Sequence, residues 1–255
     1  MKLVIHPEYR FLEPFLRDLP HHFKYGGRLL HTGRNTIKLF EVKGLKLVVK
    51  SYGRPHLLNR WVYLHLRAGK AKRAFMHAER LRGLGIETPH EVAFMECSKR
   101  GLLTESYFVS LYSDGISFAE AVGAFPDPEA RRIIDSFVPF AAELHAKGVL
   151  HEDLNADNVR YRLAASGYRF ELIDTNRMRF VKKTSDRACM INLRRLTHNA
   201  PPYLYFIERY ARLTGRDPNQ TLLQGSILLL SFTRWVRRKE RIKMKTGRDD
   251  KHLRH

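Results

Sequence analysis

The spacing of hydrophobic residues changes along the chain, near residue 112. Before that point, the segment 36–42 alternates polar and apolar residues with period two, and after a Lys43-Gly44 turn the segment 45–50 follows as a second strand. After it, apolar residues recur every three to four positions, which is the spacing of amphipathic helices. The pattern predicts an α+β protein with a small, strand-rich N-terminal part and a mostly helical C-terminal part.

Individual elements follow from these periods. Strands are expected over 28–50, 92–97 and 105–111, with one helix between them at 70–84. In the C-terminal part a helix opens at Pro128, and Pro139 should kink or split it. The outline is completed by a strand at 149–150, a hairpin over 159–173, and helices at 185–199, 203–214 and 220–243.

The charge is strongly positive and unevenly distributed. Lys and Arg number 46 against 26 Asp and Glu, a formal net charge of +20, while the 44% hydrophobic content excludes a disordered chain. Residues 50–82 hold nine Lys and Arg and one acid, Glu79, and residues 234–255 hold ten against three. We expect a polyanionic partner, which can be a phosphorylated substrate, an acidic membrane surface or a nucleic acid. An ordinary solvated surface is the alternative.

Targeting signals and cysteine frameworks are not apparent. The chain has no run of about 20 apolar residues that would span a bilayer. The N-terminal apolar residues are interrupted at once by His6-Pro7-Glu8, unlike a signal peptide, and Cys97 and Cys189 have no metal-binding spacing. These observations predict a cytoplasmic protein.

Three polar residues of the C-terminal part have the order and spacing of a phosphotransferase site. Asp153 and Asn158 lie five positions apart after a short strand, and Asp174 follows the next apolar strand. Phosphoryl transfer needs a carboxylate beside the attacking hydroxyl and oxygen ligands for Mg²⁺ on the β- and γ-phosphates of ATP. Asp153 fits the first role, and Asn158 and Asp174 fit the second. Alternatively, each of these residues only caps a turn.

The N-terminal part contains candidates for binding the phosphates. Lys50 ends a strand, where a lysine would bind the α- and β-phosphates, and Glu79 on the following helix is the acid expected to pair with it. A surface ion pair is the alternative for Glu79. Gly33 and Arg34 lie between the first two strands in a phosphate-covering loop, or in a plain hairpin turn.

These motifs resemble those of the lipopolysaccharide core kinases, the Kdo and core-heptose kinase family, which is a branch of the protein-kinase-like fold. The resemblance runs from about Gly33 to Arg195 and is carried by Val48-Val49-Lys50, residues 151–158 (HEDLNADN) and residues 173–177 (IDTNR). It implies a bilobal fold, with an ATP-binding lobe at 1–111 and a lobe at 112–255 that carries the catalytic loop, the metal site and a basic C-terminal helix.

The same resemblance implies the reaction. Such enzymes use MgATP to phosphorylate a sugar hydroxyl of the lipopolysaccharide inner core, here Kdo or another inner-core sugar on a lipid A precursor, at the cytoplasmic face of the inner membrane. Asp153 would be the catalytic aspartate, Lys50 the ATP lysine, and Asn158 and Asp174 the ligands of Mg²⁺. Glu152 replaces the H-R-D arginine of protein kinases, and Asp174-Thr175-Asn176 replaces D-F-G. No A-P-E segment follows, and the short distance from Asp174 to the next helix favours a small or lipid-linked acceptor over a peptide.

Basic residues after Asp174 fit an anionic acceptor. We expect Arg177 and Arg179 to contact a carboxylate or phosphate of the substrate, although an ordinary surface role is the alternative. The basic helix near the C-terminus either contacts an anionic membrane or packs on its own lobe. Two rival functions remain open: a kinase for another small molecule or a protein, and an inactive kinase fold that binds RNA or ribosomes.

Overall fold

The computed structural model describes residues 1–53 and 68–245. Parts of both basic stretches, at 54–67 and 246–255, therefore lie outside the described residues. The chain divides into two compact units: unit 1 comprises Met1–Asp114 and Leu172–Arg177, and unit 2 comprises Gly115–Glu171 and Met178–His255. Unit 1 thus includes a short segment from the second half of the sequence, and this segment contains Asp174.

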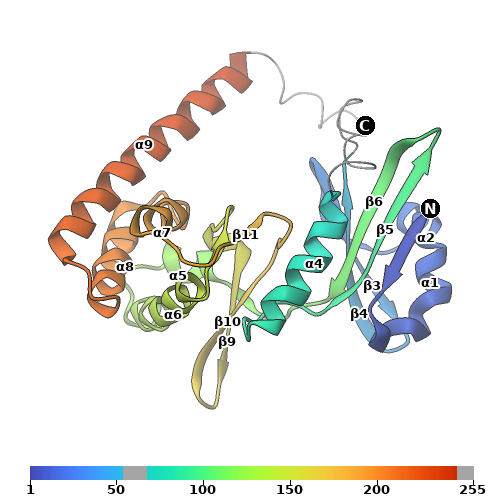
Figure 1. The fold of residues 1–255 in the computed structure, drawn as a ribbon, viewed down its shortest axis with the longest axis horizontal. Helices are drawn as coiled ribbons and strands as arrows, with labels where there is room; N and C mark the ends of the chain where they lie inside the picture. The colour runs from blue at the N-terminus through green and yellow to red at the C-terminus, as the bar shows by residue number, and fades with distance from the viewer. Residues whose placement is uncertain (54–67, 246–255) are drawn as a thin grey trace. The chain divides into compact units, whose positions relative to one another are not determined.

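Unit 1 is built on an antiparallel sheet of six strands in the order β1-β5-β6-β4-β3-β2 (Figure 1). Its central strands, β4 (Leu45–Tyr52) and β6 (Leu102–Leu111), pair so that Lys50 lies opposite Phe108. The other strands are β1 (Lys2–Ile5), β2 (Arg28–His31), β3 (Asn35–Val42) and β5 (Glu91–Lys99). The expected strands at 36–42, 45–50, 92–97 and 105–111 are confirmed.

Helices cover both faces of this sheet (Figure 1). One face packs against N-terminal helices, whose Leu12, Leu16 and Leu19 are fully buried. These helices are η1 (Pro7–Leu12), α1 (Glu13–Arg17) and α2 (Leu19–Tyr25). The other face packs against α4 (Lys70–Gly83) through Ala71 and Phe75. The N-terminal helices were not predicted, because they are short and His6, Pro14 and Pro20 interrupt their hydrophobic pattern.

Strand alternation places Lys50 on the α4 face. Side chains of a strand point alternately to the two faces, and Leu47 and Val49 of β4 are buried against the N-terminal helices. Lys50 and Tyr52 therefore point to the opposite face, where Tyr52 packs with Ala71 and Phe75 of α4. The alternation of side chains along β4 therefore determines which face of the sheet carries the lysine.

Unit 2 is mostly helical. Its longest buried helix, α6 (Pro128–Ala146), packs against α5 (Phe118–Gly123) and α8 (Ala200–Leu213), and α8 packs in turn against α9 (Pro218–Lys245). Gly148 follows α6 with φ of 71°, and the Val181 carbonyl lies where a Cβ would be, so glycine is required there. The smaller elements are β7 (Ile116–Ser117), β8 (Val149–His151), η2 (Ala156–Asn158), β9 (Val159–Ala164), β10 (Gly167–Leu172), β11 (Met178–Phe180) and α7 (Asp186–Leu193).

Two helix predictions need correction. Pro139 does not split α6, which is continuous through it; the apolar face around it, including Phe137, Val138 and Ala141, is buried and offsets the missing backbone donor. The helix expected at 185–199 ends at Leu193, and α8 begins at Ala200 rather than at 203. Residues 194–199 form a connecting segment. Within the described part of the chain, no helix has both the length and the hydropathy of a membrane span.

A buried histidine joins three helices and a strand of unit 2. His145, at the end of α6, is 3% exposed, and its Nδ1 lies 2.7 Å from the Tyr210 hydroxyl of α8. Its Nε2 lies 3.1 Å from Oδ1 of Asn192 in α7, and the Asn192 amide donates to the His151 carbonyl at 2.5 Å. Burial lowers the pKa of His145 to about 4. A neutral imidazole that donates from Nε2 and accepts at Nδ1 satisfies both contacts.

This buried imidazole should make the protein acid-sensitive. Because the pKa of His145 is about 4 when folded and about 6.5 in an unfolded chain, the unfolded state binds the proton more readily between these values. We expect the free energy of unfolding to fall as pH drops from about 6.5 to about 4, by at most about 1.4 kcal/mol per pH unit from this group. Denaturant unfolding of wild type and His145→Gln across this range measures the slope.

The exposed His31 provides the control. His31→Gln should keep the wild-type slope, whereas His145→Gln should reduce it. An unchanged slope in His145→Gln would show that another group is responsible for the acid sensitivity.

Candidate active site

In unit 1, Lys50 and Asp174 form a close ion pair. The Lys50 Nζ lies 2.7 Å from Asp174 Oδ1, and both side chains are mostly shielded from solvent. Lys50 Nζ also lies 5.4 Å from the ring centroid of Tyr52. Burial, followed by the Asp174 carboxylate, raises the pKa of Tyr52 well above its usual value, so this phenol stays neutral. The structure therefore brings together two residues that lie far apart in the sequence.

The backbone around Asp174 is held in an uncommon conformation. Asp174 has φ of 57°, in the left-handed region, which costs energy for a residue other than glycine. The next residue fixes the segment to α4: the Thr175 hydroxyl donates to the Ala74 carbonyl at 2.9 Å, and the Thr175 carbonyl lies 2.7 Å from Nδ1 of His77. The Asn176 amide also donates to Asp174 Oδ1. These contacts hold the carboxylate towards Lys50.

The expected Lys50–Glu79 ion pair does not occur in the described part of the chain. Lys50 pairs with Asp174, and Glu79 is exposed to solvent. The reason lies in helical spacing: His77, whose ring contacts Thr175, and Glu79 lie on opposite borders of the buried stripe of α4. Glu79 therefore points away from the side of α4 that contacts the Asp174 segment.

Cations gather where a helix glutamate was expected. The Lys70 Nζ, at the start of α4, lies 5.9 Å from the ring centroid of Tyr52, which Lys50 also contacts. Partial burial lowers the pKa of Lys70 to about 8, and the nearby positive charges add to this effect. These charges come, largest effect first, from Arg34, Arg177, Arg73 and Lys50. We call Lys70 and these four residues the cation cluster. It is suited to bind a polyanion such as a triphosphate.

The loop between β2 and β3 contributes Arg34 to the cation cluster. Gly33 has no left-handed φ, and only His31 comes near the position of a Cβ, so the turn does not require glycine there. The close approach occurs at Gly53 instead, where the Arg34 carbonyl occupies the space that a Cβ would need. Sequence reasoning missed Gly53, because the contact joins the ends of two different strands.

In unit 2, the catalytic loop is held by several hydrogen bonds. The Asp153 N–H donates to His151 Nδ1 at 3.1 Å, and His151 is held by the buried Asn192–His145 network. The Asn158 side-chain amide donates to the Asp153 carbonyl at 2.8 Å, and Asn155 Oδ1 accepts from the Asn158 N–H at 3.0 Å. The observed hydrogen bond of the Asn158 side chain uses its amide nitrogen and not its amide oxygen, Oδ1. An amide oxygen presented in this way suits a hard cation.

Arg195 is a further residue beside Asp153, and the sequence did not single it out. Its Nη1 lies 3.3 Å from Asp153 Oδ1, and its guanidinium lies 5.1 Å from the ring centroid of Phe232 in α9. The sequence analysis did not identify Arg195 as a site residue because it placed residue 195 inside the helix expected at 185–199. Of the two arginines expected to bind the acceptor, the exposed Arg177 belongs to the cation cluster of unit 1. In unit 2, Arg179 Nε lies 4.0 Å from a Glu152 oxygen.

Comparison with known proteins identifies the family. The family model described as lipopolysaccharide kinase (Kdo/WaaP) matches residues 32–221, which is most of the chain. The chain belongs to this lipopolysaccharide kinase family. It is therefore a phosphotransferase that uses ATP and an alcohol group as acceptor, and the rival interpretation as an inactive kinase fold is set aside.

Two further likenesses agree with a kinase fold. A solved structure of WaaP in complex with acyl carrier protein has a TM-score of 0.63 and 18% identity, covering 93% of this chain and 99% of that one. This likeness confirms the predicted α+β, protein-kinase-like fold. A rice protein (Oryza sativa subsp. japonica) with the provisional name cyclin-dependent kinase F-2 is 41% identical over 81 residues, 28% of this chain. The match spans a quarter of that relative's length.

The low pKa of Lys70 generates a prediction for this lipopolysaccharide kinase. A bound triphosphate favours the charged amine, so ATP binding above pH 8 must take up a proton. We expect the Kd for ATP to be flat just below pH 8 and to rise above it, by at most about tenfold per pH unit. Lys70→Arg should flatten this rise, because a guanidinium stays charged.

Calorimetric titration with ATP between pH 7.5 and 9.5, in buffers of different ionisation enthalpy, measures both the affinity and the proton uptake. Lys46→Arg, at an exposed position of the same sheet, is the matched control. Equal pH dependence in wild type and Lys70→Arg would remove Lys70 from the nucleotide site.

Proposed function

We propose that this kinase transfers the γ-phosphoryl group of MgATP to a hydroxyl of Kdo, or of another inner-core sugar, on a lipid A precursor. The observation that carries the proposal is the ion pair between Lys50 and Asp174, because a lysine and a carboxylate from distant segments meet there beside the cation cluster. Family membership supplies the coarser class, a lipopolysaccharide kinase.

In this proposal the cation cluster binds the nucleotide. Lys50 neutralises charge on the α- and β-phosphates, and Arg34 and Lys70 approach the outer phosphates. Asp174 would supply a carboxylate oxygen to Mg²⁺. Glu79, exposed on α4, has no contact with Lys50 and is no longer proposed as its partner.

Asp153 acts on the acceptor. Its carboxylate orients the sugar hydroxyl and accepts its proton as the oxygen forms a bond to the γ-phosphorus. The bond between that phosphorus and the bridging oxygen breaks, and ADP leaves with the electron pair. The loop is fixed by the Asn158 amide, which donates to the Asp153 carbonyl, and by His151 Nδ1, which accepts from the Asp153 N–H. Arg195 orients the Asp153 carboxylate.

One residue in each unit has the chemistry of a magnesium ligand. Asn158 keeps its amide oxygen available, and Asp174 supplies a carboxylate oxygen, the ligand types that Mg²⁺ prefers. When bound, the ion would supply positive charge that offsets the negative charge developing on the transferred phosphoryl group. The role of the protein is to hold these two oxygens through the Asp153 carbonyl contact and the Thr175 contacts to α4.

An anionic acceptor fits the exposed arginines. Kdo carries a carboxylate and lipid A carries phosphates, and both groups suit the fork of a guanidinium. Arg177 and Arg179 are therefore proposed to contact the acceptor. A small-molecule or protein acceptor remains the competing reading within the kinase class, and nucleic acid is the disfavoured alternative partner.

Peripheral contact with the cytoplasmic face of the inner membrane is also proposed, through α9. One face of this helix is buried on unit 2 through Gly225, Leu229 and Phe232. The opposite face exposes an apolar stripe, which is continued along the helix by exposed cations. The stripe is Leu223, Ile227 and Leu230, and the cations are Arg234, Arg237, Arg238 and Arg241. This combination is typical of helices that lie on anionic bilayers.

Mass spectrometry of lipid A–core tests the acceptor. Cells that lack this protein should lose one phosphate from an inner-core sugar, and fragment ions should assign it to Kdo. Wild type and Asp135→Asn, which has the same chemical change at an exposed position, should restore the phosphate. Asp153→Asn should not, since losing the proton acceptor lowers the rate by a factor of about 10²–10⁴. A phosphate that Asp153→Asn restores fully would contradict the assigned role.

Vesicle sedimentation tests the membrane contact. With phosphatidylglycerol vesicles at low salt, wild type should pellet and Ile227→Asp should lose most of its binding, because a carboxylate enters the apolar stripe. Leu213→Asp is the matched control, since Leu213 is 55% exposed and Ile227 57%. If Ile227→Asp binds like the control, α9 is not the contact surface.

A further inference from the structure

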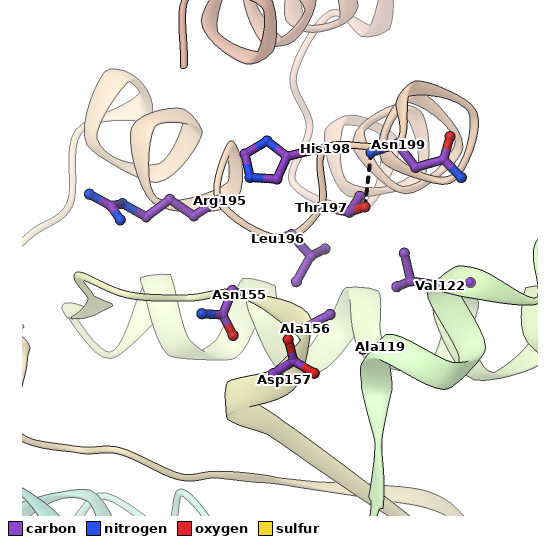
Figure 2. A pocket seen from close by; sticks show the side chains of 11 residues that line it. Ala119, Val122, Asn155, Ala156, Asp157, Arg195, Leu196, Thr197, His198 and Asn199 are labelled. Atoms are coloured by element: carbon purple, nitrogen blue, oxygen red, sulfur yellow. Dashed lines mark hydrogen bonds between the residues drawn. The ribbon is translucent and has the colours of Figure 1, made fainter. Parts of the chain in front are cut away.

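A cavity of about 400 Å³ lies in unit 2 directly beside the catalytic loop (Figure 2). Residues 155–157 line it on one side, the segment 195–199 lines it on the side facing them, and Ala119 and Val122 of α5 complete the wall. Its volume is within the range of small-ligand sites, about 300–1,000 Å³. The three segments that form it belong to one compact unit.

The lining combines hydrogen-bonding groups with small apolar ones. Asn155, Asp157, Thr197, His198 and Asn199 offer polar side chains, while Ala119, Val122 and Leu196 offer apolar ones. A sugar ring has the matching properties, because its rim carries hydroxyl groups and its faces carry C–H groups. An acyl chain, which has no hydrogen-bonding groups, would leave these polar side chains without partners.

Two of the segments that line the cavity carry residues close to the proposed catalytic carboxylate. Asn155 is two residues after Asp153, and Arg195, which lines the cavity, lies 3.3 Å from Asp153 Oδ1. A ligand seated in the cavity therefore extends towards the group that accepts the hydroxyl proton. Its closeness to Asp153 distinguishes this cavity from a cavity in unit 1, which is lined by Met1, Arg10 and Arg17 among others.

The walls of the cavity are held in place from behind. The His198 ring stacks on Phe232 of α9 with 5.3 Å between ring centroids, and Arg195 packs on the same ring. The Ala156 N–H donates to the Leu196 carbonyl at 3.0 Å, which joins the two facing segments. The Thr197 hydroxyl accepts from the Asn199 N–H at 3.0 Å. A preorganised wall of this kind lowers the entropic cost of binding.

We propose that this cavity binds the acceptor, and specifically the sugar ring whose hydroxyl is phosphorylated. The inference rests on the proposed function and adds the site that selects the acceptor. His198 and Thr197 bind hydroxyl groups on one side of the ring, Asp157 binds them on the other, and Ala119 and Val122 contact a C–H face. Arg195 joins this site to Asp153.

A substitution that fills the cavity tests the inference. Ala119→Leu adds a larger apolar side chain to the wall without changing the helix N-cap, which is the Ser117 hydroxyl. Ala124→Leu is the same change at the exposed end of α5, outside the cavity. The assay measures phosphate transfer from radiolabelled ATP to a lipid A precursor that carries Kdo, in detergent micelles, with the precursor and ATP varied in turn.

Ala119→Leu should raise the KM for the precursor by about tenfold or more and leave the KM for ATP within about twofold, whereas Ala124→Leu should match wild type. His198→Ala, at an exposed position, should also raise the KM for the precursor and serves if Ala119→Leu is unstable. Transfer by wild type with an unchanged precursor KM in both variants would overturn the cavity assignment alone. No transfer by wild type to the precursor would overturn the proposed function, and the inference with it.

Discussion

The ion pair between Lys50 and Asp174 joins β4 to the segment Leu172–Arg177, which unit 1 takes from the second half of the sequence. It forms because three constraints agree: the period of β4 turns Lys50 to the α4 face, Thr175 fixes the chain to α4, and Asp174 adopts a left-handed backbone. Together they place a carboxylate and an amine in one position that neither would hold alone.

The catalytic loop of unit 2 depends on a different kind of interaction. A neutral, buried His145 in α6 contacts Tyr210 of α8 and Asn192 of α7. The Asn192 amide in turn donates a hydrogen bond to the His151 carbonyl, which fixes the start of the catalytic loop. Buried polar networks are costly when any member lacks a partner, so they tolerate few alternative arrangements. In this way the packing of helices far from Asp153 determines where the Asp153 backbone lies.

Much of this architecture was readable in the sequence. The alternation at 36–42 and the turn after it identified β3 and β4, and the spacing of Asp153, Asn158 and Asp174 indicated the reaction class. The partner of Lys50 was not readable, because Glu79 and His77 differ by only two positions, and helix rotation alone decides which one faces the Asp174 segment. Arg195 was missed because ending a helix at Leu193 depends on tertiary contacts of the following segment.

The cation cluster has an energetic consequence for the protein without nucleotide. Five positive side chains share a small volume, and their mutual repulsion, with partial burial, already makes the Lys70 amine easier to discharge. A bound polyphosphate therefore stabilises unit 1 by more than its own contacts, because it also reduces the repulsion between these positive side chains. We therefore expect unit 1 to have a lower free energy of unfolding without nucleotide than with nucleotide bound.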